Sequence, residues 1–178
     1  MSSRRILHSA NVVSAMPAIG KTYLATKFPN LFRDLESSDY HWLKDPETDE
    51  ILFNENGDKI EHPEWPNNYI DAIKNLNQSG MYRVIFVSAH ELVRQKMKEQ
   101  NIKYATMFGS DTNTCKTMLI SRCIARHSSP KFIEDYRENY STYVKSMRND
   151  PNAVARIEVD AKALEMGEDW LLRVLLQE

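Results

Sequence analysis

Residues 15–22 read AMPAIGKT and match the phosphate-loop pattern G-x-x-x-x-G-K-[ST] at every specified position except the first, where Ala15 replaces glycine. In such a loop, successive backbone N–H groups and a helix N-terminus bind phosphate oxygens, a lysine supplies a cation, and a hydroxyl ligates Mg²⁺. Lys21 and Thr22 take the last two positions, and Gly20 leaves room for the phosphate. The chemistry predicted for this segment is the binding of a nucleoside triphosphate with Mg²⁺.

The context of this loop favours that interpretation over a turn that merely starts a surface helix. A segment rich in β-branched residues precedes the loop, and a helix-forming segment follows it. The residues expected to contact the triphosphate are Ala15, Met16, Pro17, Ala18, Ile19, Gly20, Lys21, Thr22 and Tyr23.

Carboxylates follow the second predicted strand, at 31–36. Asp34, Glu36 and Asp39 have the chemistry to orient Mg²⁺, to accept a proton from an acceptor hydroxyl, or to hold a sugar hydroxyl. The alternative is a solvated strand end shared with neighbouring serines. We expect Asp34 and Glu36 to act both in catalysis and in acceptor binding.

A second polar group follows the most apolar segment of the chain, 84–87. In a parallel sheet these side chains emerge at the crevice where ligands bind. Ser88 is expected to contact the water shell of Mg²⁺, and Arg94 to reach an anionic group of the acceptor. His90 is more typical of a helix start than of a catalyst.

Arginines and aromatic residues recur at helical spacing later in the chain. Arg122 and Arg126 are four residues apart and present two guanidinium groups on one helical face, which is either a site face or a solvated one. Spacings of four, four and three favour a core stripe over a base-stacking platform for Phe132, Tyr136, Tyr140 and Tyr143. Trp42 and Trp65 either contact the acceptor or anchor the segment between them.

The remaining pattern predicts the elements that position these groups. Strands are expected at 6–13, 31–36, 84–87, 102–108 and 155–159, with 84–87 at the centre of the sheet. Helices are expected after Gly20, from Pro66, from about 90 to 100, at 113–127, at 130–148 and as a closing apolar helix around 164–176. The predicted fold is therefore α/β, a three-layer α/β/α domain with about five mostly parallel strands.

One domain, 1–178, is expected, because 178 residues and 20.7 kDa fit a single core. Segment 44–63 is predicted to be an exposed inserted β-hairpin with Asn56 and Gly57 in its turn.

Composition limits the partners. A net charge of −2 gives no global electrostatic reason to bind nucleic acid or an anionic membrane. Apolar runs are too short to cross a bilayer, and residues 1–5 lack the apolar segment of a secretory signal. Cys115 and Cys123 make neither a disulfide nor a zinc site, which favours a reduced, cytoplasmic chain.

The chain resembles the P-loop nucleoside and nucleotide kinases, and more narrowly the small kinase-like P-loop proteins of bacteria and their phages. The resemblance spans most of the chain and rests on residues 14–23, 34–38, 66–70, 85–94 and 122–143. Similar members have an Asp-x-Asp-Ser-Ser motif after strand two, and Glu36 stands here for the second Asp.

The resemblance implies an adenylate-kinase-like fold with ATP and Mg²⁺ at the loop and an acceptor above the strand ends. It also implies a helical, arginine-bearing lid, which corresponds to 109–150. The expected activity is phosphoryl transfer from ATP to a nucleoside, a nucleotide or a similar small acceptor, in the host cytoplasm if the chain is phage-encoded. The residues expected to act in catalysis are Lys21, Asp34, Glu36, Arg122 and Arg126.

Two alternatives remain at this point. One is a P-loop NTPase that works as a switch or a binding component without a small acceptor. The other is a kinase of a hydroxylated base in DNA, against which the modest net charge weighs.

Overall fold

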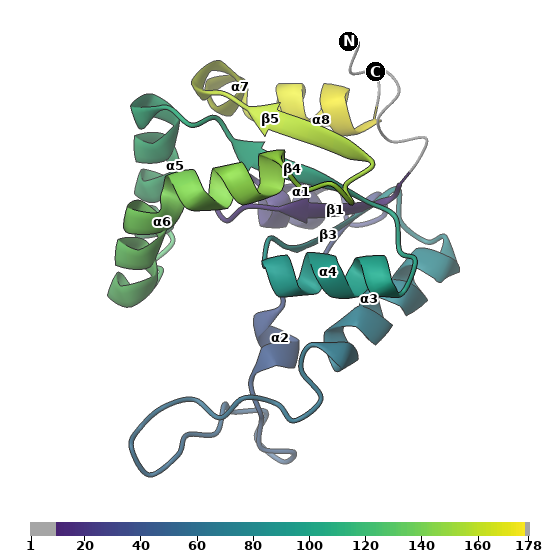
Figure 1. Ribbon diagram of the computed structural model, residues 1–178, viewed down its shortest axis with the longest axis vertical. Helices are drawn as coiled ribbons and strands as arrows, with labels where there is room; N and C mark the ends of the chain where they lie inside the picture. The colour runs from purple at the N-terminus through teal and green to yellow at the C-terminus, as the bar shows by residue number, and fades with distance from the viewer. Residues whose placement is uncertain (1–9, 177–178) are drawn as a thin grey trace.

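A computed structural model describes residues 10–176 as a three-layer α/β/α fold around one five-stranded parallel sheet (Figure 1). The strand order is β2-β3-β1-β4-β5, and every neighbouring pair is parallel. The strands are β1 Val12–Ala15, β2 Phe32–Asp34, β3 Val84–Ser88, β4 Tyr104–Gly109 and β5 Ala155–Val159. The helices are α1 Lys21–Lys27, α2 Ser38–His41, α3 Asn67–Ser79, α4 Glu91–Glu99, α5 Asn113–Ala125, α6 Pro130–Arg148, α7 Ala161–Met166 and α8 Glu168–Leu176.

Alternation along the strands sends side chains into two cores. Val13 of β1 packs in a cluster that also holds Leu24 of α1 and Leu175 of α8. Its neighbour Val12 packs in a second cluster with Ile73 of α3 and Val93 of α4. Because successive residues of a strand point to opposite faces, helices must cover both sides of the sheet.

The predicted α/β class is confirmed, with two corrections to the strands. The sheet is entirely parallel, and β1 rather than β3 lies at its centre. A continuous apolar run indicates that a strand is buried on both faces of the sheet. An interior strand next to the central one, such as β3, is buried in the same way. The first strand starts at Val12 and extends to Ala15; residues 6–9 of the predicted strand lie outside the described residues.

Most predicted helices match the structure closely, and the last one is split. Helix α6 spans the predicted range, and the apolar stripe of α3 is buried through Tyr69, Ile70 and Ile73. The predicted closing helix is two helices, α7 and α8. They are separated by Gly167, whose φ of 59° takes the chain out of the helical conformation.

The segment that joins α2 to α3, residues 42–65, protrudes from the domain and is called the excursion below (Figure 1). It is held by isolated antiparallel bridges, Trp42 to Glu61, Lys44 to Ile51 and Phe53 to Lys59. The segment therefore reverses direction twice, through two turns. The hairpin expected at 44–63 would reverse direction once. The predicted turn at Gly57 is present, with φ 79°.

Helices α5 and α6, expected as a lid, are anchored in the core. Cys115, Leu119, Tyr140 and Val144 are fully or almost fully buried, and α6 packs against β4 and β5. The connection between the two helices is exposed. Between residues 10 and 176, no helix combines the length and the apolar character that crossing a bilayer requires.

Candidate functional site

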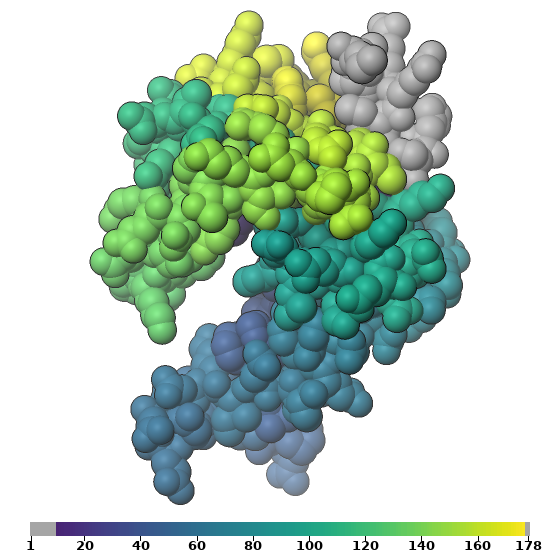
Figure 2. Space-filling model, in the orientation of Figure 1, coloured from purple at the N-terminus to yellow at the C-terminus, as the bar shows by residue number. Residues whose placement is uncertain are grey.

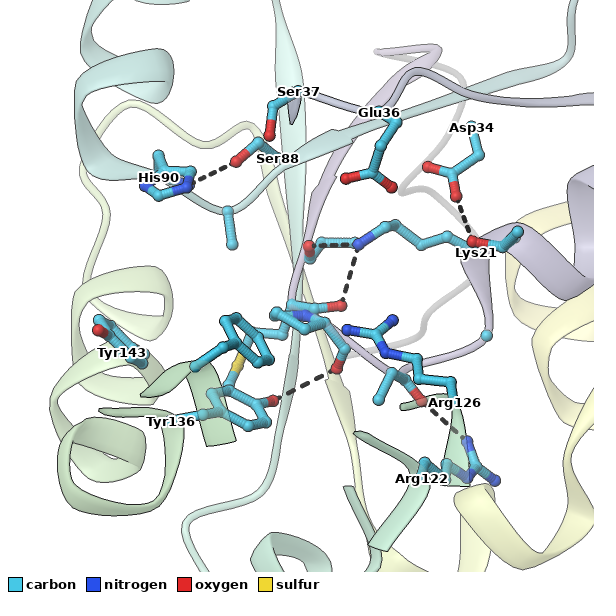
Figure 3. A pocket seen from close by; sticks show the side chains of 18 of the residues that line it. Lys21, Asp34, Glu36, Ser37, Ser88, His90, Arg122, Arg126, Tyr136 and Tyr143 are labelled. Atoms are coloured by element: carbon cyan, nitrogen blue, oxygen red, sulfur yellow. Dashed lines mark hydrogen bonds between the residues drawn. The ribbon is translucent and has the colours of Figure 1, made fainter. Parts of the chain in front are cut away.

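A cavity of about 1110 Å³ lies at the carboxyl ends of β1, β2 and β3. Here the chain reverses its order in the sheet, since β2 and β3 lie on one side of β1 while β4 and β5 lie on the other. Open parallel sheets bind ligands at such a switch point. In Figure 2 an open hollow separates the green α5–α6 pair from the blue excursion, and Figure 3 shows the side chains inside the cavity.

The predicted phosphate loop forms one wall of this cavity. Ala15 ends β1, and positive φ angles fall at Ala18 (62°) and at Gly20 (117°), which precedes α1. Met16 and Ile19 are fully buried, and Ile19 does not line the cavity. The backbone of the loop thus turns sharply at the start of α1, as a phosphate-binding loop requires.

Lys21 lies across this loop. Its Nζ donates to the carbonyl oxygens of Ala15 at 3.1 Å and Met16 at 3.3 Å. Burial lowers the pKa of Lys21, and the nearby carboxylates of Asp34 and Glu36 oppose that shift. The lysine therefore faces both the loop and the two predicted acidic residues.

The structure gives Gly20 a role that the motif alone does not. A Cβ at this position would lie 2.9 Å from Leu171 Cδ1 of α8, and the backbone is left-handed. We expect Gly20→Ala to lower the free energy of unfolding by about 1–3 kcal/mol in denaturant titrations. Ala18→Gly is the control, because glycine adopts the positive φ already present at Ala18, and its effect should stay below about 1 kcal/mol. Equal stability of both variants would contradict this role.

Thr22 and Asp34 form a polar pair that joins α1 to β2. Thr22 Oγ1 donates to Asp34 Oδ2 at 2.6 Å. Within residues 10–176, Asp34 Oδ1 is a buried side-chain oxygen without a hydrogen-bond partner. The Thr22 hydroxyl and the Asp34 carboxylate, one oxygen of which has no partner, are hard oxygen donors of the kind that Mg²⁺ prefers. These residues fit the predicted ion, although the described residues hold no group of three His, Cys, Asp or Glu side chains arranged for a metal.

Glu36 is exposed and differs from Asp34 in its surroundings. Its carboxylate turns toward Lys21 across the cavity, with Ser37 beside it (Figure 3). Asp39 lies outside the cavity lining and approaches Lys44 of the excursion at 3.5 Å. The two predicted acidic residues that line the cavity are therefore Asp34 and Glu36.

Tyr69 joins the two strand ends that carry the polar groups, which the sequence pattern did not indicate. Its hydroxyl donates to the carbonyl oxygen of Leu35 at 2.6 Å and accepts from the amide of Ser88 at 3.0 Å. Burial raises its pKa well above the ordinary tyrosine value, so the hydroxyl keeps its proton. For this residue the sequence predicted only a place in the helix that starts from Pro66.

Ser88 lines the cavity as predicted, whereas Arg94 does not. The Arg94 side chain is 3% exposed and forms an ion pair with Asp150 at 2.7 Å. It also donates to Ser146 Oγ at 2.6 Å and to the carbonyl oxygen of Ala89. The expectation that Arg94 binds the acceptor is therefore wrong for this structure, because its guanidinium is already used inside the protein.

The two predicted lid arginines make different contacts. Arg122 donates to the carbonyl oxygens of Ala18 at 3.2 Å and Leu164 at 2.8 Å, and so ties the loop to α7. Arg126 is exposed, contacts Ser128 Oγ at 3.0 Å and extends toward Lys21 (Figure 3). Arg126 is the better placed of the two to meet a phosphoryl group.

The aromatic stripe of α6 packs in the core, as its spacing predicted, and also reaches the cavity. Tyr140 is buried in the core, and its hydroxyl donates to the carbonyl oxygen of Ser110. Phe132, Tyr136 and Tyr143 line the cavity, and Tyr136 stacks on both neighbours. Three rings therefore form one cavity wall.

The tryptophans lie elsewhere. Trp42 and Trp65 stack on the two faces of His41, with ring centroids 4.1 and 4.3 Å from it. Neither residue lines the cavity. Their contacts anchor the excursion, the alternative given for them from the sequence.

The fold and the site together define a three-layer α/β protein with a large polar and aromatic cavity at the carboxyl edge of its sheet. No protein-family model and no curated protein matches the chain. Among solved structures, the chain is similar to an uncharacterized protein from Eubacterium ventriosum, with 14% identity and a TM-score of 0.44 over 94% of this chain and 97% of that one.

Proposed function

We propose that the protein transfers the γ-phosphoryl group of ATP to a hydroxyl group of a small acceptor. The observation that carries the proposal is the meeting of Lys21, Asp34 and Glu36 in one cavity that also contains the loop. A loop and a lysine suffice to bind a triphosphate, whereas a second, exposed carboxylate beyond the lysine suits an acceptor.

The binding roles follow from position. The loop amides and Lys21 would hold the β- and γ-phosphates, and Arg126 would neutralise charge from the opposite side. Thr22 and Asp34 are the residues that would hold Mg²⁺, which supplies neutralisation of charge on the phosphate oxygens. Arg122 positions the loop through Ala18 instead of contacting the phosphates.

The chemical step then uses Glu36. The acceptor oxygen forms a bond to the γ-phosphorus while the bond from that phosphorus to the β,γ-bridging oxygen breaks, and ADP leaves with the electron pair. The hydroxyl proton passes to the carboxylate of Glu36, which lines the cavity and faces Lys21, whereas Asp34 is bonded to Thr22. The aromatic wall from Phe132 to Tyr143 would reduce access of water that competes with the acceptor.

The test is calorimetric titration of ATP with Mg²⁺, followed by ATP turnover across a panel of hydroxylated compounds. We expect Lys21→Ala to weaken ATP binding by about 10- to 100-fold, because it removes a charged hydrogen-bond donor from the phosphates. Lys98→Ala, which changes an exposed lysine of α4 outside the cavity, is the control and should bind as the wild type does.

Two results would refute the proposal: no binding of ATP by the wild-type protein, or equal binding by Lys21→Ala. Hydrolysis of ATP without any phosphorylated acceptor, stimulated by a protein or DNA partner, would favour the switch-type NTPase instead.

A further inference from the structure

Charged side chains are unevenly distributed between the two ends of the cavity. The cationic residues of its lining are Lys21, Arg122 and Arg126, and all three lie at what we call the loop end (Figure 3). Arg122 is held by two carbonyl oxygens, and the other two face the position proposed for the triphosphate. At the loop end, the cationic side chains of Lys21 and Arg126 would therefore interact with the phosphoryl donor.

The opposite end, called the acceptor end, is lined by Glu36, Ser37, Ser88 and His90, which Figure 3 labels, and by Glu91, which follows His90 in the chain. These side chains are two carboxylates, two hydroxyls and an imidazole. Desolvation lowers the pKa of His90, with a further contribution from the charges of His41 and Arg94, so the ring is neutral near pH 7. Among the described residues, the acceptor end therefore presents hydroxyl and carboxylate groups, and the cation that Glu36 faces there is Lys21, which the proposed function assigns to the triphosphate.

The two remaining sources of anion affinity are also blocked. Arg94, the arginine nearest this end in the chain, is buried against Asp150. Helix α4 begins at this end, and Glu91 in its first turn already places a carboxylate at the positive end of the helix dipole. A phosphate bound at this position would meet negative charge from both Glu36 and Glu91.

The approach to the cavity is acidic too. Residues 44–64 of the excursion hold eight carboxylate side chains and two lysines, and the excursion forms one side of the hollow seen in Figure 2. A nucleic-acid strand entering there would be repelled, because polyanion binding depends on cations that neutralise its phosphates.

From this charge distribution we infer that the acceptor is an uncharged, hydroxyl-bearing small molecule, and that the site rejects acceptors that carry a phosphate, both nucleotides and nucleic acid. The inference rests on the proposed function and narrows it to one class of substrate. The site distinguishes uncharged from phosphate-bearing acceptors by charge, because a phosphate at the acceptor end would lack a cationic partner and would be repelled by carboxylates. Size does not distinguish them, since the cavity is large enough for two ligands.

The test uses protein saturated with a non-hydrolysable ATP analogue and Mg²⁺, titrated with the four deoxynucleoside 5′-monophosphates and with a short single-stranded oligodeoxynucleotide. Wild-type protein should give no saturable heat with any of them at millimolar concentration. Ser37→Arg places a guanidinium at the acceptor end and should gain at least about tenfold in affinity for a monophosphate. Glu91→Lys inverts one repelling charge and should also raise the affinity for a monophosphate. It keeps the test conclusive if Ser37→Arg does not fold.

Ser121→Arg adds the same cation on the exposed face of α5 outside the cavity and should gain nothing. Saturable binding of a monophosphate or the oligonucleotide by the wild type would overturn the inference. It would also be overturned if neither Ser37→Arg nor Glu91→Lys gained affinity. Failure of the ATP analogue to bind, seen before any acceptor is added, would instead be a failure of the proposed function.

Discussion

Glu36→Gln is expected to lower the turnover number for phosphoryl transfer by about 10²- to 10⁴-fold, the usual contribution of a general base, while ATP affinity stays near that of the wild type. Glutamine keeps the length and the hydrogen-bonding oxygen of the side chain but cannot take the acceptor proton. Glu36 is exposed in the cavity and makes no contact with Thr22, so its replacement leaves the proposed Mg²⁺ position untouched.

Asp34→Asn is the matched comparison, because it changes a second cavity carboxylate that faces Lys21 in the same way. In the Asp34→Asn variant, the enhancement of ATP binding by Mg²⁺ should be weaker than in the wild type. The reason is that Asp34 accepts the hydrogen bond from Thr22 and carries the oxygen that has no partner. Calorimetry at several Mg²⁺ concentrations and steady-state turnover separate the two effects. Reduced turnover for Asp34→Asn alone, with Glu36→Gln fully active, would exclude Glu36 as the base.

These separate roles were not accessible from the sequence, which placed both carboxylates at one strand end and assigned them the same set of functions. The pattern predicts where a strand ends, because apolar residues give way to polar ones. The hydrogen bond from Thr22 to Asp34 depends on how α1 and β2 pack, and packing is a property of the whole fold.

The elements themselves were largely predictable. A helix such as α6 shows a strong 3.6-residue period over 19 residues, so its span follows from the sequence alone. Strand order does not, because β3 is the more apolar strand and yet β1 lies at the centre, a position that only tertiary pairing sets. Gly167 was also missed as a break, since apolar residues continue on both sides of it.

Arginine positions were the least predictable part of the site. Arg122 and Arg126 share a helical face, yet one is bonded to backbone carbonyls and the other is exposed in the cavity. A guanidinium at the end of a long side chain can serve a ligand or the protein, and spacing along a helix does not distinguish the two. The distinction is testable at Arg94, where the two uses predict opposite experimental results.

Arg94→Met is expected to lower the free energy of unfolding by about 3–5 kcal/mol, because it leaves the Asp150 carboxylate buried without its cation. Tyr104, whose hydroxyl donates to the same carboxylate at 3.0 Å, cannot neutralise that charge. Chemical denaturation measures the loss, and Arg83→Met, a change of an exposed arginine, should cost less than about 0.5 kcal/mol.

A double variant separates structural stabilisation from acceptor binding. Asp150→Leu added to Arg94→Met removes the stranded charge, so it should recover much of the lost stability, as is common when both partners of a buried ion pair are replaced. If Arg94 instead bound the acceptor, Arg94→Met would fold as stably as Arg83→Met and raise the Michaelis constant for the acceptor. We expect the loss of stability, because both side chains of the ion pair are at most 6% exposed. The Arg94 guanidinium is then used inside the protein and is not available at the acceptor end of the cavity.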